Sequence, residues 1–155
     1  MPNALVADTA LISNAFYLEV DGAPMTMLTG VSGLDIGVEA TNLRQTTSAG
    51  KAVWTRTLGV KQTSGTLTLT RLAVVDATNE GVWKWFSDTS LKGALDAARK
   101  NGSVVMYGSD GTELGRYNFT NGWVSKIALD GLDATAGNPL KETITLEIDF
   151  LERVK

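Results

Sequence analysis

The sequence predicts a mainly β protein, an antiparallel β-barrel or sandwich with one flanking α-helix. Several segments alternate apolar and polar residues with the period of two that is expected of half-buried strands. The 16 glycines, together with repeated Asp-Gly and Asn-Gly pairs, suit a chain with many tight turns. Residues 79–99 have instead the residue spacing of a helix. These patterns predict roughly seven to eight strands.

The predicted strands follow one another along the chain. Residues 16–20 alternate apolar and polar side chains, and residues 66–70 alternate threonine with leucine. Residues 103–119 are typical of a hairpin that turns at residues 109–111. Residues 143–150 alternate again, and one face of this strand is expected to carry its apolar side chains: Ile144, Leu146, Ile148 and Phe150.

The helical region, residues 79–99, begins with a cluster of large side chains. Thr78 or Asn79 is predicted to cap it. Lys84 points away from the cluster on a helical projection, whereas one broad face carries Val82, Trp83, Trp85 and Phe86. A stacking platform for bases or sugars would need rings interleaved with arginine, and the cluster contains none. We therefore expect this face to be a packing anchor against the sheet.

One domain is expected to span residues 1–155, because a chain with 43% hydrophobic and 20% charged residues can bury a core. Residues 1–14 are predicted to form an N-terminal extension. Residues 41–56 are polar and poor in aliphatic side chains, which predicts a long exposed loop or arm between two strands. Loops of that length are usually functional or disordered, and the sequence leaves both open.

The composition argues against several classes of function. The chain has no cysteine and no histidine, so the commonest metal ligands, general bases and activated nucleophiles are missing. We therefore expect no enzymatic activity, no metal and no cofactor. The net charge is −3, and long basic runs are absent, which argues against tight binding of nucleic acid. We also expect no membrane insertion and synthesis in the cytoplasm, since no segment has the pattern of a membrane span or secretory signal.

A series of motifs follows a definite order along the chain. It comprises Val-Ser-Gly-Leu at 31–34, Leu-Thr-Leu-Thr-Arg at 67–71, the tryptophan pair in "VWKWFSD", the Asp-Gly hairpin ending in Asn121-Gly122-Trp123, and a closing strand with Glu142 and Glu147. This order resembles the tail-tube family of contractile phages and phage-derived injection systems, from about Phe16 to Val154. Val124 stands where that family often has proline, and both a phage tail and a bacterial injection particle remain open.

The resemblance implies a subunit that joins its sheet with those of its neighbours. Six copies would form a ring, and stacked rings would form a hollow tube inside a contractile sheath. Ring closure would also remove the exposed sheet edges of an isolated subunit. The implied partners are further copies of the chain, sheath and baseplate proteins, and a cargo of DNA or effector protein that passes without tight binding. Such a protein would assemble in the bacterial cytoplasm and end in a phage virion or a released particle.

Two sets of residues are candidates for these roles. The wall of the channel is expected to carry alternating polar positions, with Glu39, Thr41, Thr66 and Thr68 as candidates. The arm is expected to contact a neighbouring subunit or the next ring, with Arg44 and Lys51 available for acidic partners. Its residues are Arg44, Gln45, Thr46, Thr47, Ser48, Ala49, Gly50, Lys51, Ala52 and Val53.

Two alternative functions stay open at this point. In the first, the protein is a monomeric β-sandwich or lipocalin-like binding module whose aromatic side chains line a ligand pocket. In the second, it is a carboxylate-based hydrolase that uses an acid such as Glu147. The oligomeric state separates the tube from the binding module, and replacement of the acid tests the hydrolase.

Overall fold

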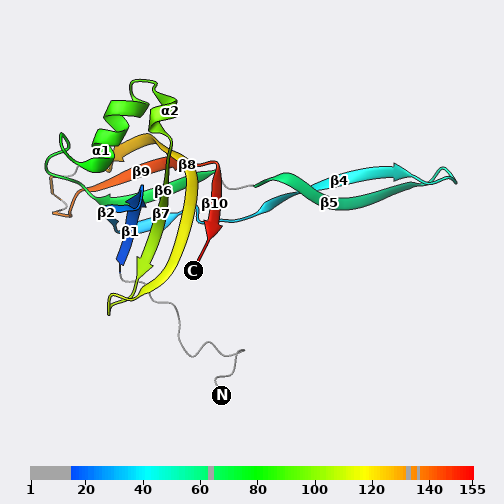
Figure 1. The fold of residues 1–155 in the computed structure, drawn as a ribbon, viewed down its shortest axis with the longest axis horizontal. Helices are drawn as coiled ribbons and strands as arrows, with labels where there is room; N and C mark the ends of the chain where they lie inside the picture. Colours follow the sequence, from blue (N-terminus) through cyan, green and yellow to red (C-terminus); the bar gives the residue numbers. More distant parts are fainter. Residues whose placement is uncertain (1–14, 63–64, 132–133, 136) are drawn as a thin grey trace, which may run out of the picture.

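The computed structural model describes residues 15–62, 65–131, 134–135 and 137–155, so the predicted extension at residues 1–14 lies outside them. Figure 1 shows a curled sheet, short helices across one end of it, and a long hairpin that projects from this body. The fold is mainly β, as predicted. Among the described residues, no helix combines the length and the hydropathy needed to cross a membrane.

The body is an antiparallel sheet of eight described strands in the order β2-β1-β7-β8-β9-β6-β3, with β10 also paired to β8. Thr29 joins the two ends of this order, and its amide donates a 2.7 Å hydrogen bond to the carbonyl oxygen of Thr70. No ladder pairs β2 with β3 or β6 among the described strands, so the predicted barrel is curled but not closed. The strands are β1 (Ala15–Val20), β2 (Ala23–Leu28), β3 (Gly30–Ser32), β6 (Thr66–Leu72), β7 (Lys100–Tyr107), β8 (Glu113–Leu129), β9 (Lys141–Glu147) and β10 (Phe150–Arg153).

The hydrophobic core lies inside this curl, and the alternation of the sequence predicts most of it. Fully buried side chains at alternate positions of three strands include Leu18, Leu67, Leu69, Ile144 and Leu146. Phe150 is an exception, because it was expected on the core face and is 46% exposed. Residues 148–149 separate β9 from β10, and the alternation shifts by one position there. Leu151 takes the core position instead.

The strand β8 is longer than the sequence indicated. Asn121-Gly122 was expected to mark a turn, but β8 continues through it for 17 residues. Its first part pairs with β7 and β10, and its second part pairs with β9. Gly122 is required for packing, because a Cβ atom there would lie 2.6 Å from Cε2 of Phe119, a core residue. The strand therefore bends over the Phe119 ring and connects both halves of the sheet.

Residues 41–56, predicted as a long exposed loop or arm between two strands, are mostly strand in the structure. They lie in a two-stranded antiparallel hairpin made of β4 (Val38–Thr46) and β5 (Ala52–Gln62). This hairpin forms a sheet of its own beside the body. Figure 1 shows it extending far beyond the other elements, so the segment is an arm with regular structure.

The helical region divides into three short pieces. These are α1 (Gly81–Trp85), a π-helical turn η1 (Phe86–Ser90) and α2 (Leu95–Ala98). Val82 and Trp85 are buried in the core, while Trp83 and Phe86 are half-buried with their ring centroids 6.2 Å apart. The predicted caps Thr78 and Asn79 are wrong, because the side chain of Glu80 accepts a hydrogen bond from the amide of Trp83. No aromatic of this cluster lines any of the three cavities described for the chain.

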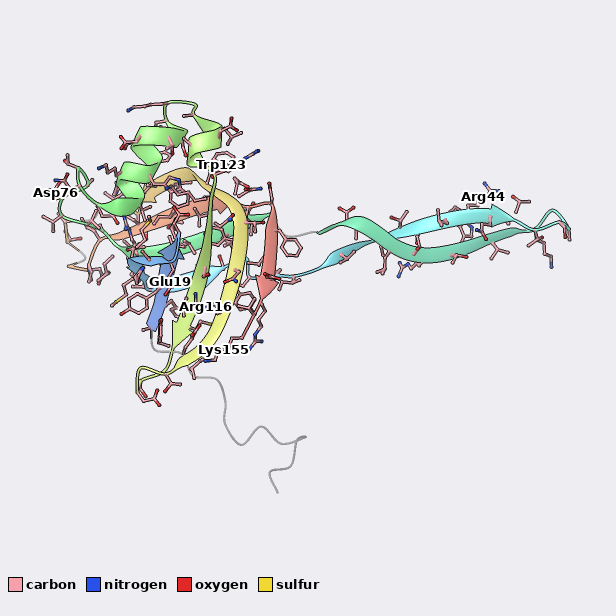
Figure 2. All side chains as sticks on the ribbon, viewed as in Figure 1. Glu19, Arg44, Asp76, Arg116, Trp123 and Lys155 are labelled. Atoms are coloured by element: carbon pink, nitrogen blue, oxygen red, sulfur yellow. The ribbon has the colours of Figure 1, made fainter. Side chains whose placement is uncertain are left out.

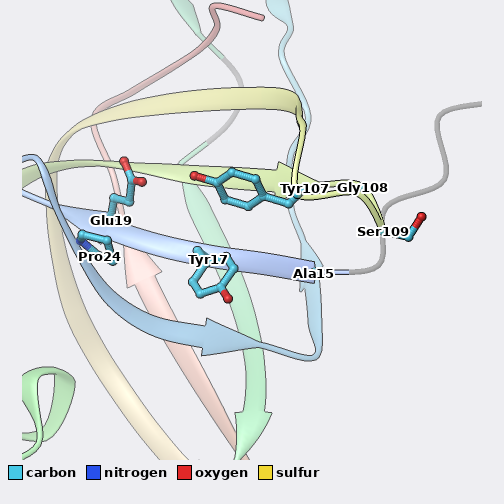
Figure 3. A pocket seen from close by; sticks show the side chains of 8 residues that line it. Ala15, Tyr17, Glu19, Pro24, Tyr107, Gly108 and Ser109 are labelled. Carbon is cyan, nitrogen blue, oxygen red and sulfur yellow. The ribbon is translucent and has the colours of Figure 1, made fainter.

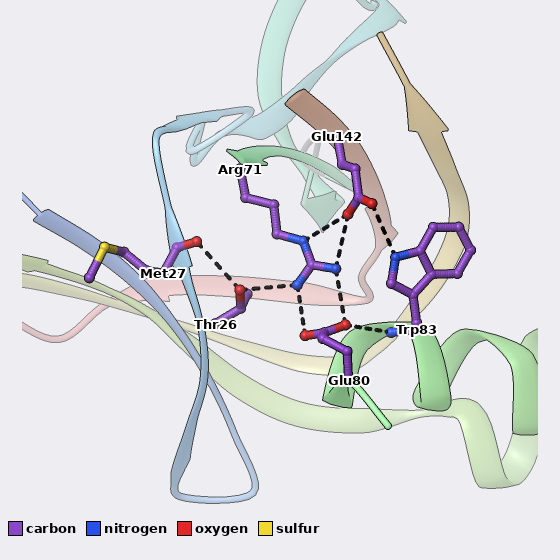
Figure 4. Close-up of polar contacts among 6 residues, drawn as sticks. All are labelled: Thr26, Met27, Arg71, Glu80, Trp83 and Glu142. Carbon is purple, nitrogen blue, oxygen red and sulfur yellow. Dashed lines mark hydrogen bonds and ion pairs between the residues drawn. The ribbon is translucent and has the colours of Figure 1, made fainter. Parts of the chain in front are cut away.

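Glu80 caps the helix because a buried arginine holds its carboxylate in place (Figure 4). Arg71 Nη1 and Nη2 lie 2.7 and 3.0 Å from the two carboxylate oxygens of Glu80. Arg71 Nε donates to Oε2 of Glu142 at 3.1 Å, and Nη1 also donates to Oγ1 of Thr26 at 3.0 Å. The indole nitrogen of Trp83 donates to the other Glu142 oxygen at 3.2 Å. This cluster connects β2, β6 and β9 to the start of α1.

The charges of the cluster shift two pKa values. Burial alone would raise the pKa of Glu80, but hydrogen bonds from Arg71 and from the Trp83 amide, together with the arginine charge, lower it below its ordinary value. Burial alone would lower the pKa of Arg71, but hydrogen bonds to Glu80 and the charges of Glu80 and Glu142 raise it. The ionised forms are therefore the stable forms in the folded protein.

The lowered pKa of Glu80 makes stability depend on pH. Its contribution is fully present above the unfolded-state pKa of about 4.3 and is lost as the pH falls through the lower folded-state pKa. We expect the free energy of unfolding to decrease over that acidic range. Urea unfolding at a series of pH values measures it, with Glu80→Gln as the comparison. If the stabilities of the parent and the variant change in parallel with pH, Glu80 does not supply this dependence.

Candidate assembly surfaces

The hairpin brings the ten predicted arm residues together at its outer end, where Figure 2 labels Arg44. Arg44 to Thr46 end β4, residues 47–51 form the turn, and Ala52 and Val53 begin β5. The turn is closed by hydrogen bonds from the Thr47 amide to the Lys51 carbonyl oxygen at 2.8 Å and from the Lys51 amide to the Thr47 hydroxyl at 3.2 Å. The tip is thus a defined turn on a regular ladder.

The register of the hairpin separates its side chains into two faces. The charged face consists of four cross-strand pairs, Ala40 with Leu58, Asn42 with Arg56, Arg44 with Trp54, and Thr46 with Ala52. The uncharged face consists of Thr41 with Thr57, Leu43 with Thr55, and Gln45 with Val53. Opposed residues share a face of a two-stranded ladder, so every arginine of the hairpin lies on the charged face.

Side chains on the charged face are held toward solvent. The guanidinium of Arg44 lies 5.8 Å from the ring centroid of Trp54, and Arg56 Nε donates to Oδ1 of Asn42 at 3.3 Å. Trp54 is 68% exposed and Leu58 is 79% exposed. Exposed apolar groups concentrated on one projecting element are typical of an interaction surface.

A second polar surface covers the body sheet on the side opposite the core. This threonine face consists of outward positions on β6 and β9, namely Thr66, Thr68, Thr70, Thr143 and Thr145. Thr68 lies opposite Thr145, and Thr70 lies opposite Thr143. Thr66 Oγ1 donates to Oε2 of Glu147 at 3.0 Å, and the Ser125 hydroxyl donates to Oε1 of the same carboxylate at 3.4 Å. The surface therefore presents hydroxyl groups around the hydrogen-bonded acid Glu147, with Asp130, which accepts a 3.4 Å hydrogen bond from Thr143, and Lys126, opposite Thr145, beside them.

The structure does not group the four candidate wall residues. Thr66 and Thr68 lie together on the threonine face, whereas Glu39 and Thr41 lie in the separate hairpin sheet. Glu147, the acid of the hydrolase alternative, belongs to the threonine face. The sequence of residues 143–147 does predict the part of this face that lies on β9. Its threonines alternate with the core residues and therefore point to the other side of the sheet.

A cavity that sequence reasoning did not find lies on the other half of the sheet (Figure 3). Its volume is about 390 Å³, and the rings of Tyr17 and Tyr107 meet edge to face with centroids 5.4 Å apart. The carboxylate of Glu19 also lines it and lies 2.8 Å from Nη1 of Arg116, which contacts Glu113 as well. The pairing of β1 with β7 creates this cavity, and that pairing cannot be read from the sequence of either strand.

The sequence matches the family described as T4-like virus tail tube protein gp19 over residues 12–152. The chain belongs to this family. Since the family spans nearly the whole chain, this tail tube protein is a structural subunit of a tail tube, as the sequence predicted. No curated protein sequence is significantly similar to it.

Solved structures share the fold of this tail tube protein. The PVC sheath/tube terminator of an extracellular contractile injection system aligns with a TM-score of 0.74 and 19% identity, covering 97% of this chain and 100% of the other. The PVC sheath-tube complex aligns with a TM-score of 0.73 and 20% identity, covering 99% of this chain and 97% of the other. Hcp1 from Salmonella typhimurium aligns with a TM-score of 0.55 and 14% identity, covering 92% of this chain and 86% of the other. These likenesses confirm the predicted tube-protein fold.

Proposed function

We propose that this tail tube protein forms hexameric rings through shared sheets, and that the rings stack into a hollow tube. The observation that carries this proposal is the projecting hairpin. A two-stranded hairpin is at best marginally stable alone in water, and this one leaves Trp54 and Leu58 exposed. A neighbouring copy would cover these side chains. Arg44 to Val53, at the outer end, would contact that neighbour or the next ring.

The threonine face is suited to the wall of the channel. Its hydroxyl groups are uncharged, and Glu147 among them is held by Thr66 and Ser125. Lys126 opposite Thr145 and Asp130 beside Thr143 add one charge of each sign. A wall with little charge of its own lets DNA or an effector protein slide, whereas a basic wall would bind a polyanion. Glu39 and Thr41, near the base of the hairpin, would join the same wall if β4 and β5 add to the sheet of a neighbour.

The proposed partners are sheath and baseplate proteins in addition to other copies of the chain. A solved relative of the same fold is described as a sheath-tube complex of a contractile injection system, and another belongs to a baseplate. We propose assembly in the bacterial cytoplasm, followed by release within a phage virion or an injection particle. The protein acts in this setting as a conduit and not as an enzyme.

Mass photometry and negative-stain microscopy of the purified protein test the proposal. We expect particles at six times the chain mass of 16.5 kDa, together with rings or stacked tubes in the images. The binding-module alternative gives particles of 16.5 kDa at every concentration. Strictly monomeric material at high concentration contradicts the tube.

Shortening the hairpin is expected to impair stacking without unfolding the body. Because Thr41 and Thr57 are cross-strand partners, Asn-Gly can replace residues 42–56 and close the ladder with a two-residue turn. We expect native circular dichroism and fewer or shorter tubes in micrographs. Ser109→Ala, in the turn between β7 and β8, keeps the full hairpin and is the matched control. Tubes of unchanged length and yield from the shortened variant contradict the role of the arm.

A further inference from the structure

The charge of the hairpin is opposite to that of the rest of the chain. Residues 40–59 contain three of the 14 lysines and arginines and none of the 17 aspartates and glutamates. Their net charge is therefore +3, and the other residues together carry −6. A projecting element of one sign on a body of the other sign favours association between copies.

Arg44, Lys51 and Arg56 of the hairpin have no acidic partner within the described residues. The described ion pairs involve other basic residues, and the contacts of Arg44 and Arg56 are to Trp54 and Asn42. Trp54 and Asn42 are both neutral, so they orient the guanidinium groups without neutralising them. The charged face is thus available for carboxylates outside the hairpin.

The body carries a groove with matching chemistry where the β1–β2 turn, β7, β8 and β10 meet. Its volume is about 320 Å³, and its lining includes the carboxylates of Asp21 and Glu152 and the polar side chains of Asn118 and Thr120. Glu152 is exposed, and its carboxylate has no side-chain hydrogen bond or ion pair in the described part of the chain. Asp21 is 61% exposed and pairs with Lys100 at 3.3 Å. Both carboxylates are therefore open to a further cation.

The other two cavities of the described residues provide fewer free carboxylates for the basic hairpin. The cavity beside Tyr17 contains one carboxylate, Glu19, and Arg116 already contacts it at 2.8 Å. The cavity lined by Ser90 and Trp123 contains no acid. Next to the groove, the half-exposed ring of Phe150 lies opposite Thr120 and provides an apolar surface for an aromatic partner.

We propose that the charged face of the hairpin docks into this groove of a second copy of the chain. Arg44 and Arg56 would pair with Glu152 and Asp21, and Trp54 would pack near Phe150. The occupant is a second copy because the hairpin projects away from its own body (Figure 1). This docking rests on the proposed tube and assigns one hairpin face and one receiving surface to the contact between subunits.

Charge reversal and its compensation test the docking. Arg56→Glu and Glu152→Arg each place like charges in the contact, so each is expected to raise the protein concentration needed for tube formation about tenfold or more. The double variant, Arg56→Glu with Glu152→Arg, restores opposite charges and is expected to return that concentration toward the parent value. Light scattering measures tube formation, and mass photometry counts rings separately.

Two controls change charge elsewhere. Thr55→Glu adds an acid to the uncharged face outside the arm residues Arg44 to Val53, and Asp96→Arg reverses an exposed acid on α2 outside the groove. Both are expected to assemble like the parent. Unimpaired single reversals overturn the docking, and so do impaired single reversals that the double variant fails to rescue. In either case, rings and tubes of the parent protein would leave the proposed function intact, whereas a parent that never assembles overturns both.

Discussion

Replacing Arg71 by methionine is expected to destabilise the fold by about 3–5 kcal/mol, because it removes the cation from a buried group of charges. Arg71 is 1% exposed and contacts the carboxylates of Glu80 and Glu142. Without it, two carboxylates face each other near the core, and the cap of α1 loses its support. Urea unfolding of the dissociated chain at neutral pH measures the loss.

Arg116→Met is the matched control for this prediction. Arg116 also lies between two carboxylates, at 2.8 Å from Glu19 and 2.6 Å from Glu113, but its side chain is 28% exposed. Solvent can hydrate the acids that remain, so we expect a loss of about 1 kcal/mol or less. Equal losses in the two variants contradict the view that burial makes the Arg71 cluster critical.

Gly33→Ala is expected to destabilise the body by about 2–5 kcal/mol. Gly33 has φ +87°, and a Cβ atom there would lie 2.3 Å from the carbonyl oxygen of Thr66. The left-handed conformation costs an alanine about 1–2 kcal/mol, and the overlap with a strand carbonyl adds about 1–3 kcal/mol. Thermal and urea unfolding measure this sum.

Gly111→Ala separates the two effects. Gly111 has φ +80° in the turn between β7 and β8, and beyond its chain neighbours no atom lies within 4 Å of the position that an added Cβ would take. Only the conformational cost of about 1–2 kcal/mol is expected there. If Gly111→Ala is as damaging as Gly33→Ala, then the close approach of Gly33 to β6 does not contribute.

The strands of the body could be predicted because each has an apolar face toward the core and a polar face toward solvent, which produces alternation in the sequence. Leu67 and Leu69 alternate with threonines, and burial of the leucines determines which face is which. The same alternation places Arg71 on the core face, which is a sequence signal of the buried cluster. Its partners could not be identified, since Glu80 and Glu142 approach Arg71 only when a helix start and β9 come together.

The hairpin could not be predicted as strands, because neither of its faces packs against the body. Leu43 and Trp54 are exposed on opposite faces, so residues 41–56 show no apolar side and resemble a loop. Similarly, Thr66 and Thr68 could be named from one strand, but the wider threonine face depends on the register of β6 with β9. The groove of Asp21 and Glu152 combines segments from both ends of the chain and required the fold.

The bent strand β8 has a mechanical consequence. Its covalent backbone continues from the part that pairs with β7 and β10 into the part that pairs with β9. A thrust on one half of the sheet is therefore transmitted along the main chain to the other half, without a loop that could swing. A subunit built in this way resists shear between its halves, as a rigid column driven lengthwise requires.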